Sequence, residues 1–252
     1  MGRRTIFKEM AMGNETPLKE RIRRGDIVIG VSASMDATKS QLEDILSKDD
    51  YGFVMTDSQH SPFSEHKMVD FCNMADEVGI PVHLRIDHPR HAYLLGNLAD
   101  LGPAMLEIPL VEDPATVREA IEFFYFPPKG RRSFVGGNRW GAELGNDMNM
   151  YAEWWNNNGI LCIQIESLRA IENIRTLSQP GLDLFSWGPS DLEWDRKMHP
   201  HHPFKTDDDC IKHVMDQVND LDVRMSYRSY DPKLRNKYLD MGVTVLFEQP
   251  QT

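Results

Sequence analysis

The sequence predicts an α/β protein of the (β/α)8 TIM-barrel class, in a single domain over residues 1–252. Two observations predict it. The chain contains eight short apolar runs, and each run except the last is followed by a helical pattern. A chain of 252 residues is long enough for one such barrel or for two smaller domains. No linker or repeat divides it, which favours one barrel.

The strands are expected where β-branched and aliphatic residues cluster, and the helices where apolar residues recur every three or four positions. Helix boundaries follow from local signals, such as Asp113 before Pro114 at a start and Gly79 at an end. The expected strands are 27–31, 53–56, 81–86, 105–109, 160–165, 182–187, 223–227 and 243–247. The expected helices are 17–24, 38–46, 64–78, 92–101, 114–124, 149–158, 168–177, 207–218 and 232–241. Residues 1–15 read as an irregular lead-in. We expect the eighth outer helix to be missing, because the sequence stops five residues after Phe247.

One connection is unusual. Residues 126–146 are rich in glycine and too long for a plain link between a helix and the next strand. Long loops in compact domains are usually functional. We therefore expect Arg132 and Arg139, which lie in this loop, to serve the site.

Composition argues against several classes of partner, cofactor site and location. The net charge of −11 argues against nucleic acid. The three cysteines, Cys72, Cys162 and Cys210, lie far apart and predict neither a disulfide framework nor a zinc cluster. We expect a cytoplasmic protein without a membrane segment, because the sequence contains neither a signal-peptide pattern nor an apolar run of transmembrane length.

The chemistry is expected at the carboxyl ends of the strands. Glu166 follows the run 160–165, and Asp191 follows the run 182–187, so both carboxylates should lie at the same end of neighbouring strands. Such a pair suits an oxygen-preferring divalent cation. The alternative is a pair of solvated loop acids.

Other polar residues end the strands beside these two. They are Asp57, His60, Arg85 and Gln164. A cation on two carboxylates could bind a keto acid through its keto and carboxylate oxygens, and an arginine could offset the charge of an enolate. A histidine could move a proton, with an aspartate fixing its tautomer. His83 and Glu107, also near strand ends, are further but less specific candidates.

Five motifs in order resemble one family. Asp57-Ser58-Gln59-His60-Ser61-Pro62 resembles the Asp-x-Glu-His-x-Pro motif of the HpcH/HpaI class II aldolases. The other four resemblances are Leu84-Arg85-Ile86 to Val-Arg-Val, residues 126–132 to Tyr-Pro-Pro-x-Gly-x-Arg, Gln164-Ile165-Glu166 to Gln-Ile-Glu, and Gly188-Pro189-Ser190-Asp191-Leu192 to Gly-Pro-x-Asp-Leu.

The resemblance implies a barrel of the phosphoenolpyruvate/pyruvate-binding type and a metal-dependent carbon–carbon lyase that cleaves a 4-hydroxy-2-keto acid to pyruvate, or a close analogue, and an aldehyde. It implies that Glu166 and Asp191 ligate Mg²⁺, Mn²⁺ or Co²⁺, and that Arg85 binds pyruvate and steadies its enolate. His60, held by Asp57, would be the acid/base. Gln164 and the backbone from Pro189 through Ser190 to Asp191 would line the keto-acid site. A homo-oligomer, based on dimers or trimers and reaching a hexamer, is also expected.

Two alternatives stay open: a decarboxylase or other carbon–carbon bond enzyme acting on an oxaloacetate-like substrate, and a non-catalytic homologue that binds metal and keto acid. Departures from the family pattern motivate them. Gln59 stands where the motif has Glu, and Trp187 and Glu193-Trp194 flank the Asp191 motif. We expect Trp187 to crowd the metal site and to contact the substrate.

Overall fold

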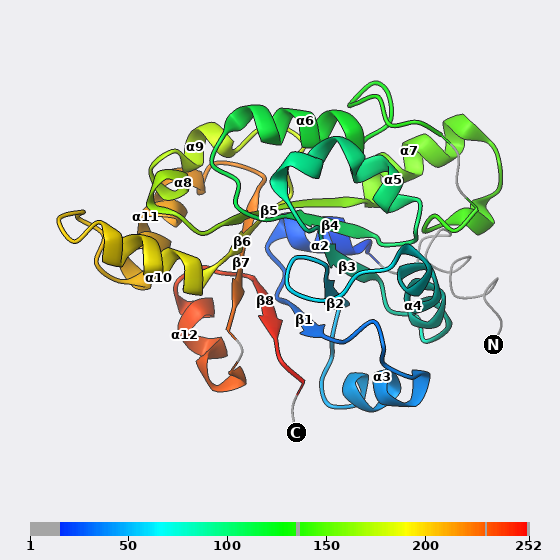
Figure 1. Cartoon of the computed structure of the whole chain (residues 1–252), viewed down its shortest axis with the longest axis horizontal. Coiled ribbons are helices and arrows are strands. Elements are labelled where there is room, and N and C mark those ends of the chain that lie inside the picture. Colours follow the sequence, from blue (N-terminus) through cyan, green and yellow to red (C-terminus); the bar gives the residue numbers. More distant parts are fainter. Residues whose placement is uncertain (1–15, 135–136, 230, 251–252) are drawn as a thin grey trace.

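The computed structural model of the protein describes residues 16–134, 137–229 and 231–250. It confirms the predicted barrel: eight parallel strands close in sequence order, with β1 paired to both β2 and β8 (Figure 1). The expected lead-in at residues 1–15 lies outside the described residues. The strands are β1 (Val28–Ser32), β2 (Phe53–Asp57), β3 (Val82–Arg85), β4 (Met105–Ile108), β5 (Ile160–Ile165), β6 (Leu184–Trp187), β7 (Arg224–Arg228) and β8 (Val245–Glu248).

Successive residues along each strand face opposite sides of the sheet, and this alternation separates two apolar cores. On β5 and β6, Cys162 and Leu184 pack inside the barrel with Phe53 and Phe247. Trp187, three residues after Leu184, belongs instead to the larger core between the sheet and the helices.

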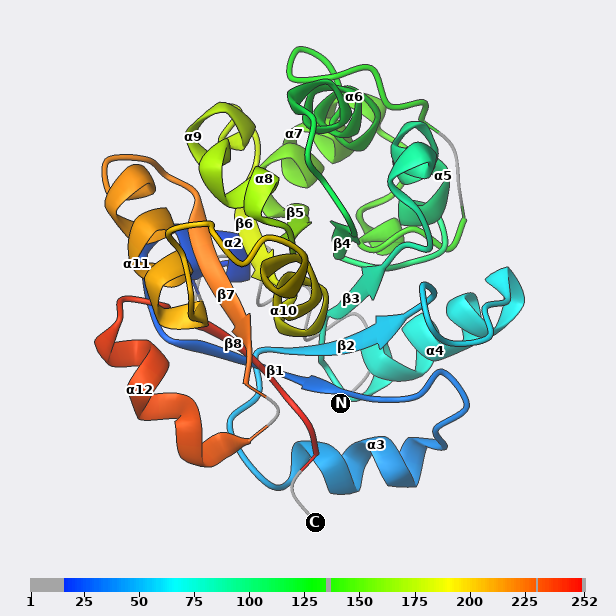
Figure 2. The same ribbon diagram turned by 60° about the vertical axis from the view of Figure 1, so that its left-hand side comes forward.

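The outer helices surround this sheet, and Figure 2 shows α3, α4, α11 and α12 outside the strands. The α-helices are α2 (Leu18–Arg24), α3 (Lys39–Leu46), α4 (Glu65–Glu77), α5 (Leu95–Ala99), α6 (Pro114–Phe124), α7 (Met148–Asn158), α8 (Leu168–Glu172), α9 (Ile174–Leu177), α10 (Pro189–Met198), α11 (Asp207–Val218) and α12 (Arg235–Asp240). Short 3-10 helices are η1 (Pro89–Leu94), η2 (Ala142–Leu144) and η3 (Pro232–Leu234). None of the described helices is long and apolar enough to cross a bilayer.

Three expected helices, 168–177, 92–101 and 232–241, differ from the prediction, and one helix was not expected; the helix expected at 232–241 begins as the 3-10 turn η3. Residues 168–177 form two helices, because the backbone of Asn173 between them leaves the helical conformation, at φ −98° and ψ 12°. The side-chain amide of Asn173 shares the carbonyl oxygen of Arg169 with its own backbone N–H, at 2.8 and 3.1 Å. Pro89 starts a 3-10 turn that takes over the first part of the helix expected at 92–101. α10 was not predicted, although Pro189 in its first turn and buried Leu192 are typical helix signals.

The N-terminal end of the barrel is closed by α2, which packs against α7. Lys19 on α2 is buried there. Its ammonium group donates to Tyr125 Oη at 2.8 Å and to the Gly159 carbonyl at 2.6 Å, and lies 3.0 Å from the Asp183 carboxylate. The opposite end, where the strands finish, therefore holds the open mouth.

Candidate active site

Arg85 is fixed by two neighbours at the mouth. Asp57 and Arg85 end adjacent strands in register. Arg85 donates from Nε to Asp57 Oδ1 at 2.8 Å and from Nη2 to Oδ2 at 2.7 Å, which is a two-point pair. Its Nη1 donates to Gln164 Oε1 on β5 at 3.1 Å. The guanidinium plane is thereby set in one orientation, as binding of a planar oxyanion requires.

This pairing keeps both groups charged. Burial acts to raise the pKa of Asp57, but the hydrogen bonds and positive charge of Arg85 outweigh it and lower that pKa. Burial acts to lower the pKa of Arg85, and the contact with Asp57 raises it above its ordinary value. The site thus holds a permanent cation.

The expected contact between Asp57 and His60 is not formed. The carboxylate oxygens of Asp57 are taken by Arg85 and by the backbone N–H of Gln59 at 3.0 Å. His60 is exposed in the loop behind β2. An acid/base role for His60 stays a prediction, and Asp57 orients the arginine.

Glu166 is a buried carboxylate with one oxygen left over. It follows β5 and is 3% exposed. Oε1 accepts from the backbone N–H of Leu110 at 2.8 Å, while Oε2 is buried and has no hydrogen-bond partner among the described residues. Burial, with the negative charges of Asp191 and Glu107, raises the pKa of Glu166 to about 7, although the Leu110 N–H acts to lower it. A cation beside Oε2 would relieve this arrangement.

Asp191 approaches Glu166 from the first turn of α10. Gly188 permits this approach, because a Cβ there would lie 2.4 Å from Glu166 Oε2 and 2.8 Å from Gln164 Nε2. Of the predicted backbone donors in this turn, Ser190 and Asp191 carry an N–H and Pro189 does not. The N-terminus of α10 adds a partial positive charge that suits a carboxylate.

These residues fit the expected divalent cation. Two carboxylates at the strand ends supply oxygen donors, and one of them has an orphaned buried oxygen. Within the described ranges, three or more His, Cys, Asp or Glu side chains do not gather as a metal cluster. The protein would therefore supply two ligands and leave positions for substrate and water.

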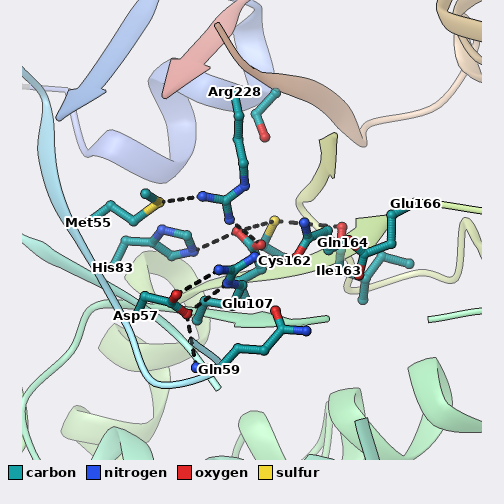
Figure 3. Close-up of polar contacts among 12 residues, drawn as sticks. Met55, Asp57, Gln59, His83, Glu107, Cys162, Ile163, Gln164, Glu166 and Arg228 are labelled. Atoms are coloured by element: carbon teal, nitrogen blue, oxygen red, sulfur yellow. Dashed lines mark hydrogen bonds and ion pairs between the residues drawn. The ribbon is translucent and has the colours of Figure 1, made fainter. Parts of the chain in front are cut away.

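A second buried charge cluster lies inside the barrel below the mouth, and the sequence-based reasoning recognised it only partly. Arg228 ends β7 and pairs with Glu107 of β4, and His83 Nε2 lies 3.2 Å from the same carboxylate (Figure 3). Burial acts to raise the pKa of Glu107, but Arg228 and His83 lower it to about 2. Burial lowers the pKa of His83, although the contact with Glu107 acts to raise it. The available signal was a charged residue inside or directly after an apolar run.

The expectation for Trp187 was wrong. Leu184 points into the barrel, so Trp187 points to the helical layer. It is fully buried, stacks on Tyr227 at 6.2 Å between ring centroids, and donates to Asp207 at 3.4 Å. Trp194 is 67% exposed on α10 and Glu193 is exposed, so these residues do not crowd Glu166 either.

Arg139 and Arg132 also lie elsewhere than expected, because the loop 126–146 returns to the N-terminal end of the barrel. Arg139 donates to the Gly145 carbonyl at 2.8 Å and lies over the Tyr151 ring of α7. Arg132 pairs with Asp100 at 2.6 Å and lies over Trp155. The loop contributes to packing at the closed end, far along the barrel from Glu166.

A cavity of about 330 Å³ opens at the mouth beside Arg85. The residues that line it come mainly from β1, β2 and the loops behind them, and they include Ser32, Met55, Asp57, Arg85, Arg228 and Gln249. Pro189 and Ser190 line a separate surface hollow of about 550 Å³ that is shared with Arg196 and Asp207. Arg85 lines the first cavity and not the second, so a ligand of the oriented guanidinium would bind in the first.

Comparison with known proteins identifies the family. The model of the HpcH/HpaI aldolase/citrate lyase family matches residues 35–218, which include Arg85, Glu166 and Asp191. The chain belongs to this family. A curated relative, the 2-keto-3-deoxy-L-rhamnonate aldolase of Escherichia coli O17:K52:H18, is 28% identical over 178 residues. That match takes in 70% of this chain and 65% of the relative, so the chain spans just under two thirds of the relative's length.

Solved structures agree on the fold. The HpcH/HpaI aldolase from Desulfitobacterium hafniense DCB-2 superposes with a TM-score of 0.79 at 21% identity, covering 93% of this chain and 90% of that one. An HpcH/HpaI aldolase/citrate lyase family protein from Burkholderia cenocepacia J2315 gives 0.76 at 20% identity, covering 92% and 91%. At such identities, the likeness supports the barrel itself.

Proposed function

We propose that this protein is a divalent-metal-dependent carbon–carbon lyase that cleaves a 4-hydroxy-2-keto acid to pyruvate, or a close analogue, and an aldehyde. The observation that carries the proposal is the position of Glu166. Its unpartnered buried oxygen lies next to Gln164, whose amide oxygen holds an arginine already oriented by Asp57. Family membership supports the same reaction class.

Each residue has a part in this reaction. Arg85 binds the keto acid and stabilises the negative charge that develops on its oxygen when the C3–C4 bond breaks. Gln164 and the N–H groups of Ser190 and Asp191 orient the substrate carboxylate. His60 accepts the proton of the 4-hydroxyl as the aldehyde forms, and the enolate is then protonated at C3 to give pyruvate.

Glu166 and Asp191 would hold the cation, for which Mg²⁺, Mn²⁺ and Co²⁺ are the candidates. When bound, such an ion supplies Lewis-acid polarisation of the keto oxygen. Because Glu166 is buried beside another carboxylate, its charge is stabilised best when the cation is present.

The test follows the enolate directly. In D₂O, the protein with Mn²⁺ should exchange the methyl hydrogens of pyruvate, as read by proton NMR, and EDTA should stop the exchange. Arg85→Lys keeps the charge but loses the two-point pair with Asp57, and the exchange rate should fall about a hundredfold. Full exchange in the presence of EDTA, or an unchanged exchange rate in the Arg85→Lys variant, would contradict the proposal.

Other substrates and a binding measurement separate the alternatives. A decarboxylase would release pyruvate from oxaloacetate and leave 4-hydroxy-2-keto acids intact. A non-catalytic homologue would bind Mn²⁺ and oxamate in calorimetry without exchanging pyruvate. We further propose a cytoplasmic homo-oligomer, for which light scattering of the purified protein measures the assembly.

A further inference from the structure

Arg228 shares the mouth cavity with Arg85. It is the last residue of β7, the position where functional side chains of a barrel lie. It is 3% exposed and forms part of the cavity wall. Figure 3 shows its guanidinium pointing into the same centre as Asp57, Glu107 and Gln164. A ligand in this cavity would thus meet two arginines.

The hydrogen-bonding capacity of Arg228 is only partly used. Its Nη2 donates to Glu107, and its Nη1 points to the thioether sulfur of Met55 at 2.9 Å. Its Nε is buried and has no hydrogen-bond partner in the described part of the chain. A guanidinium carries five N–H donors, and a thioether is a weak acceptor. The charge of Arg228 is therefore balanced, while donors remain for an oxyanion.

A purely structural role explains Arg228 poorly. Barrel interiors are usually filled with branched apolar side chains, and a buried ion pair stabilises a fold little compared with apolar residues of the same volume. Glu107 holds Arg228 from one side, and the Phe247 ring lies 5.0 Å from the guanidinium carbon. These contacts fix the guanidinium in place and leave it at the cavity.

We propose that Arg228 determines specificity by binding a carboxylate on the aldehyde portion of the substrate. The inference rests on the proposed lyase reaction. There, Arg85 and Gln164 take the keto-acid end, so the rest of the cavity wall, which includes residues 32–36 and Arg228, would face the aldehyde end. A planar guanidinium can contact Glu107 on one edge and a substrate carboxylate on another.

The test compares aldehydes in the condensation direction. Pyruvate is offered with glyoxylate, malonate semialdehyde or succinate semialdehyde, and with the uncharged acetaldehyde, propanal or butanal. For at least one pair, the protein should prefer the carboxylated aldehyde. In Arg228→Met, the ratio of kcat/KM for carboxylated over uncharged aldehyde should fall about ten- to a hundredfold, as loss of a charge-assisted hydrogen bond predicts.

Two further variants test whether a change in aldehyde preference comes from the loss of Arg228 itself. Arg228→Met leaves Glu107 without its cation, so the double variant Glu107→Gln/Arg228→Met removes the uncompensated charge and should show the same loss of preference. Arg235→Met is the matched control. Arg235 pairs with Glu248 and Asp49 near the end of β8 but does not line the cavity, so the preference should persist.

The outcomes separate the two proposals. If pyruvate exchange proceeds but Arg228→Met changes both aldehyde classes equally, or neither, the role of Arg228 is overturned and the lyase reaction stands. If pyruvate exchange is absent, both proposals fail. An Arg228-dependent preference for glyceraldehyde 3-phosphate over every carboxylated aldehyde would overturn the carboxylate assignment.

Discussion

Two buried charge clusters, the Lys19–Asp183 network at the closed end and the groups around Glu166 and Arg228 at the mouth, differ in their hydrogen bonding. At the closed end, Lys19 has three oxygen partners, and Asp183 accepts from Arg23, Tyr125 and the backbone of Leu161. At the mouth, Glu166 Oε2 and Arg228 Nε are buried without hydrogen-bond partners among the described residues.

The difference separates groups that hold the fold from groups prepared for a ligand. An unpaired buried polar atom destabilises a protein unless something binds it. The satisfied network around Lys19 joins α2 to the sheet, whereas at the mouth Arg228 lines the cavity and Glu166 Oε2 lies against the turn that contains Gly188. Substitutions in the Lys19 network should therefore alter stability, and those at Glu166 or Arg228 should alter chemistry.

The largest expected effect comes from Glu166→Gln. The substitution keeps the shape and the acceptor for the Leu110 N–H but removes the charge that would hold the cation. Pyruvate exchange should fall at least about a hundredfold, while the melting temperature of the metal-free protein should not fall, because a poorly solvated carboxylate is removed. A variant that loses stability in proportion to activity would contradict the division between the two ends.

Lys19→Met should show the reverse pattern. Removing the cation from a buried network should lower the free energy of unfolding by about 3 kcal/mol, measured by urea denaturation. Exchange activity at 20 °C should remain within about twofold, because Lys19 lies at the opposite end of the barrel from Glu166. A selective loss of activity in a fully folded Lys19→Met protein would break the comparison.

A smaller effect is expected from Gly188→Ala. The new methyl group would meet Glu166 Oε2 and push the β6–α10 turn away from Gln164. Affinity for Mn²⁺, measured by calorimetry, should fall about tenfold or more. Gly137→Ala is the control, since a Cβ there has no neighbour within 4 Å. Equal affinities for the two variants would show that the close approach is unimportant.

The last expected effect concerns pH. Burial lowers the pKa of Lys19 to about 8, although Asp183 acts to raise it, and the ordinary value is 10.5. Between these values the unfolded chain binds more protons than the folded one, so the contribution of Lys19 to stability rises with pH. From pH 8 to 9.5, the stability difference between wild type and Lys19→Met should grow by up to about 1.4 kcal/mol per pH unit. A flat difference would contradict this.

Much of the fold could be predicted because periodicity and capping are local. Every expected strand is present, and α6 and α11 begin and end where the sequence indicated. The break at Asn173 is a change of backbone conformation at a single residue, which apolar spacing does not reveal. α10 was missed because its polar surface leaves one buried residue, Leu192, and no apolar stripe.

The sequence places Arg85 at the end of its strand and Glu166 directly after its strand, and the structure has both there; their roles stay predictions. The prediction was wrong where it depended on the direction in which a side chain points. Trp187 is one residue further along than inward-facing Ser186, and this single step turns it to the other face of the sheet. The prediction that Arg139 lies at the site was wrong because a long loop can return to either end of a barrel. Arg228 was overlooked because strand 223–227 was ended one residue early.

The position of the closed end also determines where a tag or tether can be attached without blocking the cavity. α2 lies against α7 at the base of the barrel, whereas Gln249 forms part of the cavity wall at the mouth. A tag or surface tether attached on the N-terminal side of α2 would leave the cavity facing the solution. The same attachment behind Pro250 would stand at the entrance and compete with the substrate for access.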